Sequence, residues 1–158
     1  MPRLLLFLAV CLLAACHHLP PPRLVYSSGF TFANYDYVVV AKPDAGHQSA
    51  VLYGMDIDLA NLLGRYNMKV VGDKELATMP ASAQQRALVA RFAMAADGRI
   101  NTVTVSFDDE RSNRTVASAT AMVKGDIYNT EDRSRIFEAL ASVIVKALVH
   151  DKDTRALQ

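Results

Sequence analysis

The chain has 158 residues, about the length of one domain. Its 17 Lys and Arg residues nearly balance 16 Asp and Glu residues, which gives a formal net charge of +1 at pH 7. This balance excludes the strongly basic surface of a nucleic-acid-binding protein. With 51% apolar and 21% charged residues, the composition also excludes a disordered chain.

The N-terminus has the features of a secretory signal. Arg3 provides a positive charge, and residues 4–15 that follow are uncharged and mostly apolar. A membrane-spanning helix needs about 20 apolar residues, whereas the hydrophobic region of a signal peptide has this shorter length. We therefore expect residues 1–15 to be a signal peptide that is removed on export.

The end of this segment, LAAC at residues 13–16, resembles the lipobox of bacterial lipoproteins. The resemblance implies cleavage between Ala15 and Cys16 and attachment of acyl chains, such as palmitate, at Cys16. Cys11 is the competing candidate, but Val10 precedes it where the family has a small residue. Lipidation is therefore predicted at Cys16.

Two consequences follow from this prediction. The residue after Cys16 is His17 rather than the Asp that retains enterobacterial lipoproteins in the inner membrane, so the resemblance implies the periplasmic face of the outer membrane. Because the chain has only two Cys residues, the mature domain contains no free thiol. This excludes a disulfide, a Cys-ligated zinc and a Cys nucleophile.

A tether separates the anchor from a single domain. Three consecutive prolines at residues 20–22 favour an extended polyproline II spacer. We assign residues 16–31 to the lipidated cysteine and this tether, which holds the domain a few nanometres from the bilayer. Residues 32–152 form one α/β periplasmic domain, and residues 153–158 form a C-terminal tail.

Strand and helix patterns alternate along the domain. Alternating apolar and polar residues, together with β-branched and aromatic residues, predict strands over residues 34–41, 68–71, 88–95, 101–107 and 115–123. An apolar stripe at helical spacing predicts a helix over residues 48–66, and the polar residues 74–85 have room for a further helical turn. A last helix begins at a cap, Asn129 or Thr130, and ends near His150.

The predicted element order is β-α-β-(α)-β-β-β-α. Both amphipathic helices can bury their apolar stripes against one face of the sheet. The predicted fold class is therefore α/β (α+β), a two-layer sandwich in which a mixed, mostly antiparallel sheet carries the helices on one face. Phe92, Phe107, Leu140 and Ile144 are expected to pack between the layers.

The sequence contains no recognisable set of catalytic residues and no motif for a cofactor or nucleotide. Asp56 and Asp58 lie two residues apart on a predicted helix, so they point in roughly opposite directions and cannot share a metal ion. The acidic residues 108–110 are interpreted as a solvated turn. His47 and His150 are each alone at a helix end. We therefore expect no enzyme activity, no metal and no cofactor.

Apolar residues on the outer side of the helices indicate a partner surface. Tyr53 and Ile57 are four residues apart and lie opposite the apolar stripe of the first helix, and Val145 is similarly placed on the last. Single exposed apolar residues need no explanation, but a pair on one face suggests an interface. These three residues are the candidate partner surface.

Residues 103–108 (VTVSFD), residues 114–118 (RTVAS) and the amphipathic helix after them resemble a group of small Gram-negative envelope lipoproteins. The group has a β-α-β-β-β-α domain and includes the curli export channel subunit, the lipoprotein ring of Pel polysaccharide export and uncharacterised relatives. The resemblance covers residues 34–152. It implies a fold of this kind and an outer-membrane location.

The resemblance also implies a function. The chain is expected to be a non-catalytic scaffold or accessory subunit of an envelope assembly, such as a secretion or polysaccharide export complex. Its expected partners are the membrane, through the lipid anchor, and an envelope protein or a second copy of the chain, with no nucleic acid. The alternative is a periplasmic binding module for a glycan, lipid or peptide. An envelope hydrolase is a third possibility that lacks a catalytic set.

Overall fold

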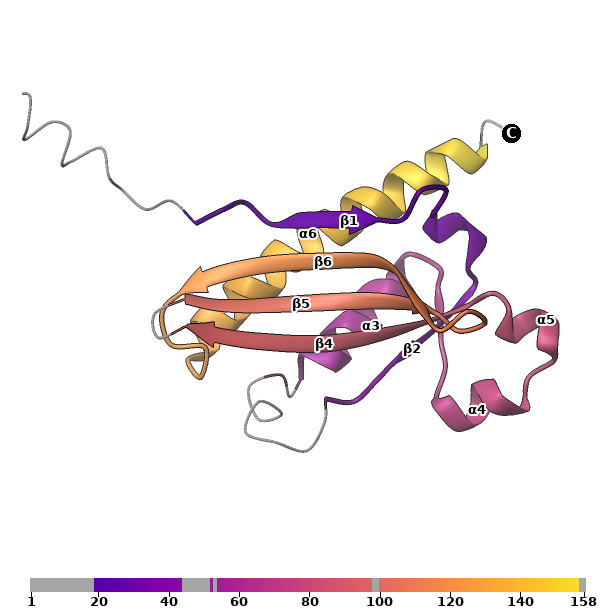
Figure 1. The fold of residues 1–158 in the computed structure, drawn as a ribbon, viewed down its shortest axis with the longest axis horizontal. Coiled ribbons are helices and arrows are strands. Elements are labelled where there is room, and N and C mark those ends of the chain that lie inside the picture. The colour runs from indigo at the N-terminus through magenta and orange to yellow at the C-terminus, as the bar shows by residue number, and fades with distance from the viewer. Residues whose placement is uncertain (1–18, 44–51, 53, 98–99, 157–158) are drawn as a thin grey trace, which may run out of the picture.

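A computed structural model describes residues 19–43, 52, 54–97 and 100–156 of the chain. The three longest strands are consecutive in the sequence, and the longest helix follows them (Figure 1). The elements in chain order are β1 (Arg23–Tyr26), the 3-10 helix η1 (Phe32–Asn34), β2 (Tyr37–Val40), α3 (Met55–Arg65), β3 (Lys69–Val70), α4 (Asp73–Thr78), α5 (Ala81–Gln84), β4 (Ala87–Asp97), β5 (Ile100–Asp109), β6 (Arg114–Lys124) and α6 (Thr130–Ala156).

The six strands form one mixed sheet in the order β1-β6-β5-β4-β2-β3. β2 runs parallel to both β3 and β4, and the other neighbouring pairs are antiparallel. The predicted hairpin after Asp97 is present, because Asp97 pairs with Ile100 across the turn. The β2–α3–β3 segment and its return to β4 require crossover connections. The path from β1 to β2 also crosses the sheet, because β6, β5 and β4 lie between these two strands.

The main hydrophobic core lies between the sheet and a layer made of α3 and α6, which cover the same face (Figure 1). β6 contributes small side chains under α6, so the helix can approach the sheet closely enough for its large aliphatic residues to fill the space. The side chains of this region are Ala117, Ala119 and Ala121 from β6 and Ile136, Leu140 and Ile144 from α6. The predicted two-layer α+β sandwich is confirmed.

The residues predicted for the core lie where we expected them. Phe107, Leu140 and Ile144 are each no more than 1% exposed, and Phe92 is half-buried against the same core. Phe107 also meets Phe32 of η1 edge to face, with ring centroids 5.1 Å apart. This contact attaches η1 to the helix-bearing face of the sheet.

A smaller second core lies on the opposite face, at the end of the sheet formed by β2, β3 and β4. Val39 and Val89 point away from the helix layer and pack with Val71 and with Leu76 of α4. The expectation that helices occupy one face therefore holds for α3 and α6 but not for α4. The reason is local: β2 and β4 carry consecutive apolar residues, and both faces of such strands need covering.

The sheet begins earlier than the sequence analysis placed the domain. We expected residues 16–31 to be tether, but Arg23–Tyr26 forms β1 and pairs with residues 117–120 of β6. A four-residue edge strand between prolines and a Gly-containing turn has too little pattern to be recognised from the sequence. The start of the last helix, in contrast, is as predicted, since the Asn129 side chain accepts a hydrogen bond from the Glu131 N–H.

Candidate partner surface

The predicted partner surface is only partly present as an exposed strip. Ile57 lies on α3 and its side chain is 56% exposed, as the helical periodicity predicts. Tyr53 lies outside the described residues. Val145 is half-buried and packs against the main core, so its predicted exposure was wrong.

The reason for the burial of Val145 is the position of α6. This helix packs against β5 and β6, and it also contacts α3, β1 and η1. Neighbouring elements therefore cover both sides of α6 as well as the face that packs on the sheet. As a result, residues beside the apolar stripe, such as Ala141 and Val145, are half-buried. A helix of this kind needs a wider apolar surface than one that contacts only a sheet.

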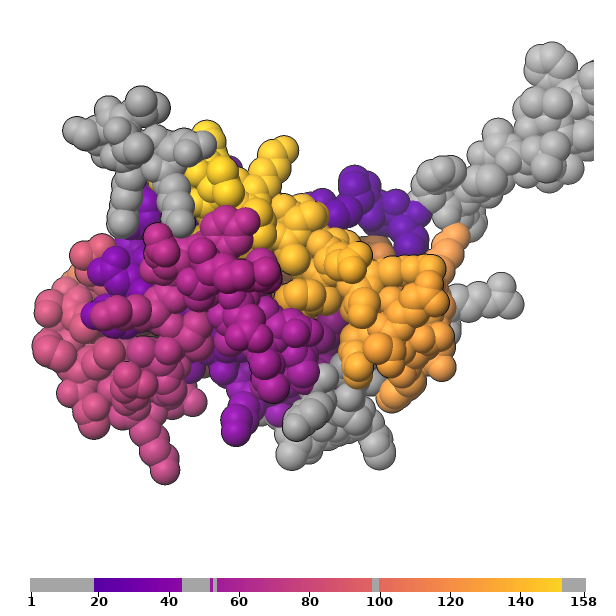
Figure 2. All heavy atoms as spheres, turned by 180° about the vertical axis from the view of Figure 1, so that it is seen from behind, coloured from indigo at the N-terminus to yellow at the C-terminus, as the bar shows by residue number. Residues whose placement is uncertain are grey.

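A groove between α3 and α6 lies on the same side of the molecule as Ile57. Two adjoining hollows of about 380 and 470 Å³ share Asp58 and Phe137, and Figure 2 shows this helix-bearing face. Phe137 is half-buried, and charged residues of both helices surround it. We call this feature the α3–α6 groove; its charged lining residues are Asp58, Arg65, Arg133 and Glu138.

Ile57 lies beside this groove rather than in it. Successive residues of an α-helix are rotated by about 100°, so Ile57 is next to Asp58 but faces outward from α3. Together, Ile57 and Phe137 present an aliphatic and an aromatic side chain on neighbouring helices within a charged surrounding. This arrangement suits contact with another protein surface better than enclosure of a small molecule.

A polar network occupies the face of the sheet that α3 and α6 leave open. Asp108 forms an ion pair with Arg91 of β4 and accepts a hydrogen bond from the Thr115 hydroxyl at 2.6 Å. Asp108 is only 8% exposed, so the predicted solvated turn over residues 108–110 was wrong at this position. Asp108 pairs with Val89 of β4, and a register shift in which Val116 of β6 is the extra residue brings Thr115 opposite Asp108.

Tyr35 and Asp109 form a second polar pair at the end of β5. The Tyr35 hydroxyl donates to Asp109 Oδ2 at 3.0 Å, and the Ser112 N–H donates to Asp109 Oδ1 at 2.7 Å. Burial, the hydrogen bond and the charge of Asp109 raise the pKa of Tyr35 to about 12. Burial acts to raise the pKa of Asp109, but hydrogen bonds from Ser112 and Tyr35 and the charge of Arg111 outweigh it and lower that pKa.

The Tyr35 hydroxyl acts as a structural donor to Asp109. Tyr35 also lines a cleft of about 260 Å³ between η1, the end of α3 and the last turns of α6. Asp151 lies in this cleft, where its carboxylate accepts a hydrogen bond from the Phe32 N–H at 2.6 Å. The volume is below the roughly 300–1,000 Å³ that is usual for small-molecule sites.

The remaining chemical candidates are separate from one another. Asp56 accepts a hydrogen bond from the Gly54 N–H, and Asp58 is exposed on the same helix. His150 lies near the end of α6, and His47 lies outside the described residues. Within the described part of the chain, no three His, Cys, Asp or Glu side chains form a group that could hold a metal ion.

None of the helices within residues 19–43, 54–97 and 100–156 is both long enough and apolar enough to cross a bilayer.

One exposed aromatic residue was missed by the sequence analysis. Tyr128 lies in the loop between β6 and α6 and is 66% exposed, whereas its neighbour Ile127 is 2% exposed and belongs to the main core. The sequence signal was an aromatic residue among Gly, Asp and Asn just before a capped helix. Such a position gives no indication of which side chain turns inward.

Comparison with known proteins finds similarity only among solved structures, since no protein-family model and no curated protein matches the chain. A PelC dodecamer from Paraburkholderia phytofirmans is 19% identical, with a TM-score of 0.48 over 78% of this chain and 94% of that chain. Lipoprotein GNA1162 from Neisseria meningitidis is 14% identical, with a TM-score of 0.41 over 72% of this chain and 96% of that chain.

A third similar structure is described as a neuraminyllactose-binding hemagglutinin homolog from Helicobacter pylori. It is 15% identical, with a TM-score of 0.40 over 85% of this chain and 97% of that chain. All three structures are less than 20% identical to this chain. The assembly and the ligand in their names are properties of those proteins.

Proposed function

We propose that this chain is a lipid-anchored envelope protein, held on the periplasmic face of the outer membrane through Cys16. In this proposal it serves as a non-catalytic scaffold or accessory subunit of an envelope assembly, of the secretion or polysaccharide export kind. The proposal rests on the short distance in sequence between the lipobox and the folded domain. Cys16 ends an LAAC motif after an apolar signal, and β1 begins only seven residues later at Arg23.

The surfaces of the domain support a role in binding other proteins. Ile57 and the α3–α6 groove place apolar side chains on an otherwise charged helix layer. Because exposed Ile57 lies beside this groove and Phe137 lines it, the scaffold is favoured over the binding module, and the partner is a second copy of the chain or another envelope protein.

Acyl labelling in the producing cells tests the anchor. Cys16→Ser should abolish incorporation of a labelled fatty acid and removal of the signal peptide, because the thiol is the acceptor and the site of processing. Cys11→Ser is the matched control and should leave both intact. Labelling that persists in Cys16→Ser, or disappears in Cys11→Ser, contradicts the proposed anchor.

The native mass of the detergent-solubilised protein tests the scaffold. We expect a ring or a complex with another protein, and Ile57→Ser should weaken that association without loss of folded protein. Val149→Ser is a matched control, since Val149 is 42% exposed on α6 and lies outside the proposed surface. A monomer that carries a bound small molecule would instead support the binding module.

A further inference from the structure

The direction in which the chain enters the domain is set by β1. β1 runs antiparallel to β6, with Arg23 opposite Thr120, so the residues before Arg23 run toward the end of β6 at Lys124. Residues 20–21 continue along this path, because they border a small hollow together with residues 120–122. The chain therefore meets the domain at the end of the sheet where β6 finishes (Figure 1).

The remaining length between this end and the anchor is short. Leu19, the first described residue, follows Cys16 by three residues. A fully extended chain spans at most about 3.6 Å per residue, so Cys16 lies within about 11 Å of Leu19. A lipidated Cys16 thus holds this end of the sheet close to the bilayer, and the spacer of a few nanometres expected from the sequence is too long.

Tyr128 projects from this same end. The loop that carries it joins the end of β6 at Lys124 to the start of α6 at Thr130. Ile127 is anchored in the core, and the Tyr128 N–H donates to the Asp126 side chain at 2.9 Å. The loop backbone therefore directs the Tyr128 ring away from the domain.

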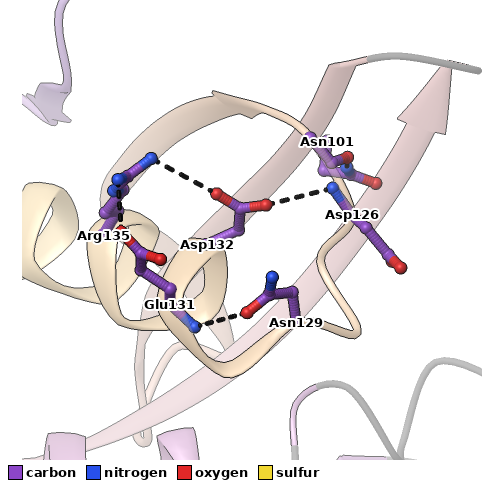
Figure 3. Close-up of polar contacts among 7 residues, drawn as sticks. Asn101, Asp126, Asn129, Glu131, Asp132 and Arg135 are labelled. Atoms are coloured by element: carbon purple, nitrogen blue, oxygen red, sulfur yellow. Dashed lines mark hydrogen bonds and ion pairs between the residues drawn. The ribbon is translucent and has the colours of Figure 1, made fainter.

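Polar contacts on both sides hold this loop in place. The Asn101 side chain donates to the Gly125 carbonyl at 2.8 Å, and the Asp126 N–H donates to Asp132 at 3.2 Å (Figure 3). Gly125 has a φ of +132°, a conformation that favours glycine. An aromatic side chain on such a preorganised loop loses little conformational freedom when it contacts an interface.

We propose that the Tyr128 side chain enters the headgroup layer of the bilayer in which Cys16 is anchored. This end of the domain then faces the membrane. The inference rests on the proposed lipidation of Cys16. Tyrosine suits the membrane–water interface because its ring is apolar and its hydroxyl stays hydrated. Two nearby carboxylates, Glu131 and Asp132, are both paired with Arg135 (Figure 3), which reduces their repulsion from anionic lipid.

This orientation directs the opposite end of the domain away from the membrane. β4 runs from Ala87 to Asp97, and Asp97 lies at the same end as Lys124 because both pair with Ile100. α5 immediately precedes the other end of β4 and lies on the far side of the molecule (Figure 1). Ser82 on α5 is exposed and provides a reference position that should stay in water.

Tryptophan fluorescence tests the inference directly, because the chain contains no Trp. Tyr128→Trp and Ser82→Trp are each produced as the full chain, purified in lipidated form and reconstituted into vesicles of phosphatidylethanolamine and phosphatidylglycerol. Lipids spin-labelled at the headgroup serve as membrane quenchers, and iodide serves as the aqueous quencher. Mass spectrometry of each preparation verifies the acyl chains on Cys16.

We expect Tyr128→Trp to lose most of its emission to the headgroup quencher, to shift to shorter wavelength and to resist iodide. Ser82→Trp should show the opposite behaviour. Equal quenching of both variants by lipid overturns the orientation. Resistance of Tyr128→Trp to both quenchers indicates contact with a protein and also overturns the inference. Protein without acyl chains overturns the proposed anchor, whereas acylated protein with an unquenched Tyr128→Trp overturns only the contact.

Discussion

Truncation of Phe107 to alanine tests the layer arrangement most sharply. Phe107 is fully buried beneath the helix layer and meets Phe32 edge to face. Replacement of a buried Phe by Ala removes apolar contacts and leaves a cavity, which costs about 3–5 kcal/mol. A domain has a free energy of unfolding of about 5–15 kcal/mol, so Phe107→Ala should lose about a fifth of it or more.

Urea unfolding followed by circular dichroism measures this loss. With a denaturant dependence of about 2 kcal/mol per molar urea, the midpoint should fall by roughly 2 M. Ser106→Ala is the matched control, because Ser106 is the preceding residue of β5 and points to the opposite face. That control should change stability by no more than about 0.5 kcal/mol. Equal midpoints for Phe107→Ala and Ser106→Ala would refute the assignment of the two faces.

Three further predictions concern the polar contacts. Asp108→Ala should cost about 1–3 kcal/mol, because it removes the acceptor of Arg91 and Thr115; a urea midpoint equal to wild type contradicts this. Gly125→Ala should cost at least about 1 kcal/mol, since its φ is +132° and the added Cβ clashes with the Asp132 carboxylate, again measured by urea unfolding. The lowered pKa of Asp109 adds stability above the unfolded value near 4, which is lost as the pH falls through the folded value. The stability difference between wild type and Asp109→Asn should therefore shrink below about pH 4, and a constant difference argues against the effect.

The regular parts of the fold could be predicted because their signals are local. β5 alternates between apolar and polar residues, and the helix ending at Arg65 has its apolar residues at helical spacing. β1 could not be predicted in the same way, since Arg23–Tyr26 acquires its strand conformation by pairing with β6, which lies about a hundred residues further along the chain. The contact between Asp108 and Thr115 depends on the register shift between β5 and β6, for which the acidic side chain of Asp108 gives no signal.

The candidate surface shows the same division between local and non-local information. Exposure of Ile57 follows from the periodicity of α3 alone. Exposure of Phe137 depends on how α3 lies beside α6, and the burial of Val145 depends on the neighbours of α6 on both flanks. Tyr128 and Ile127 are adjacent in the sequence, and only the folded loop determines which of the two faces outward.

Both the proposed function and the proposed membrane contact require that the chain is a lipoprotein anchored through Cys16. The most direct measurement is the intact mass of the protein purified from the cell envelope, with sequencing of its N-terminal peptide by mass spectrometry. We expect a chain that begins at Cys16 and carries a diacylglyceryl group on the sulfur. A chain that retains residues 1–15, or that has an unmodified Cys16, would contradict this expectation.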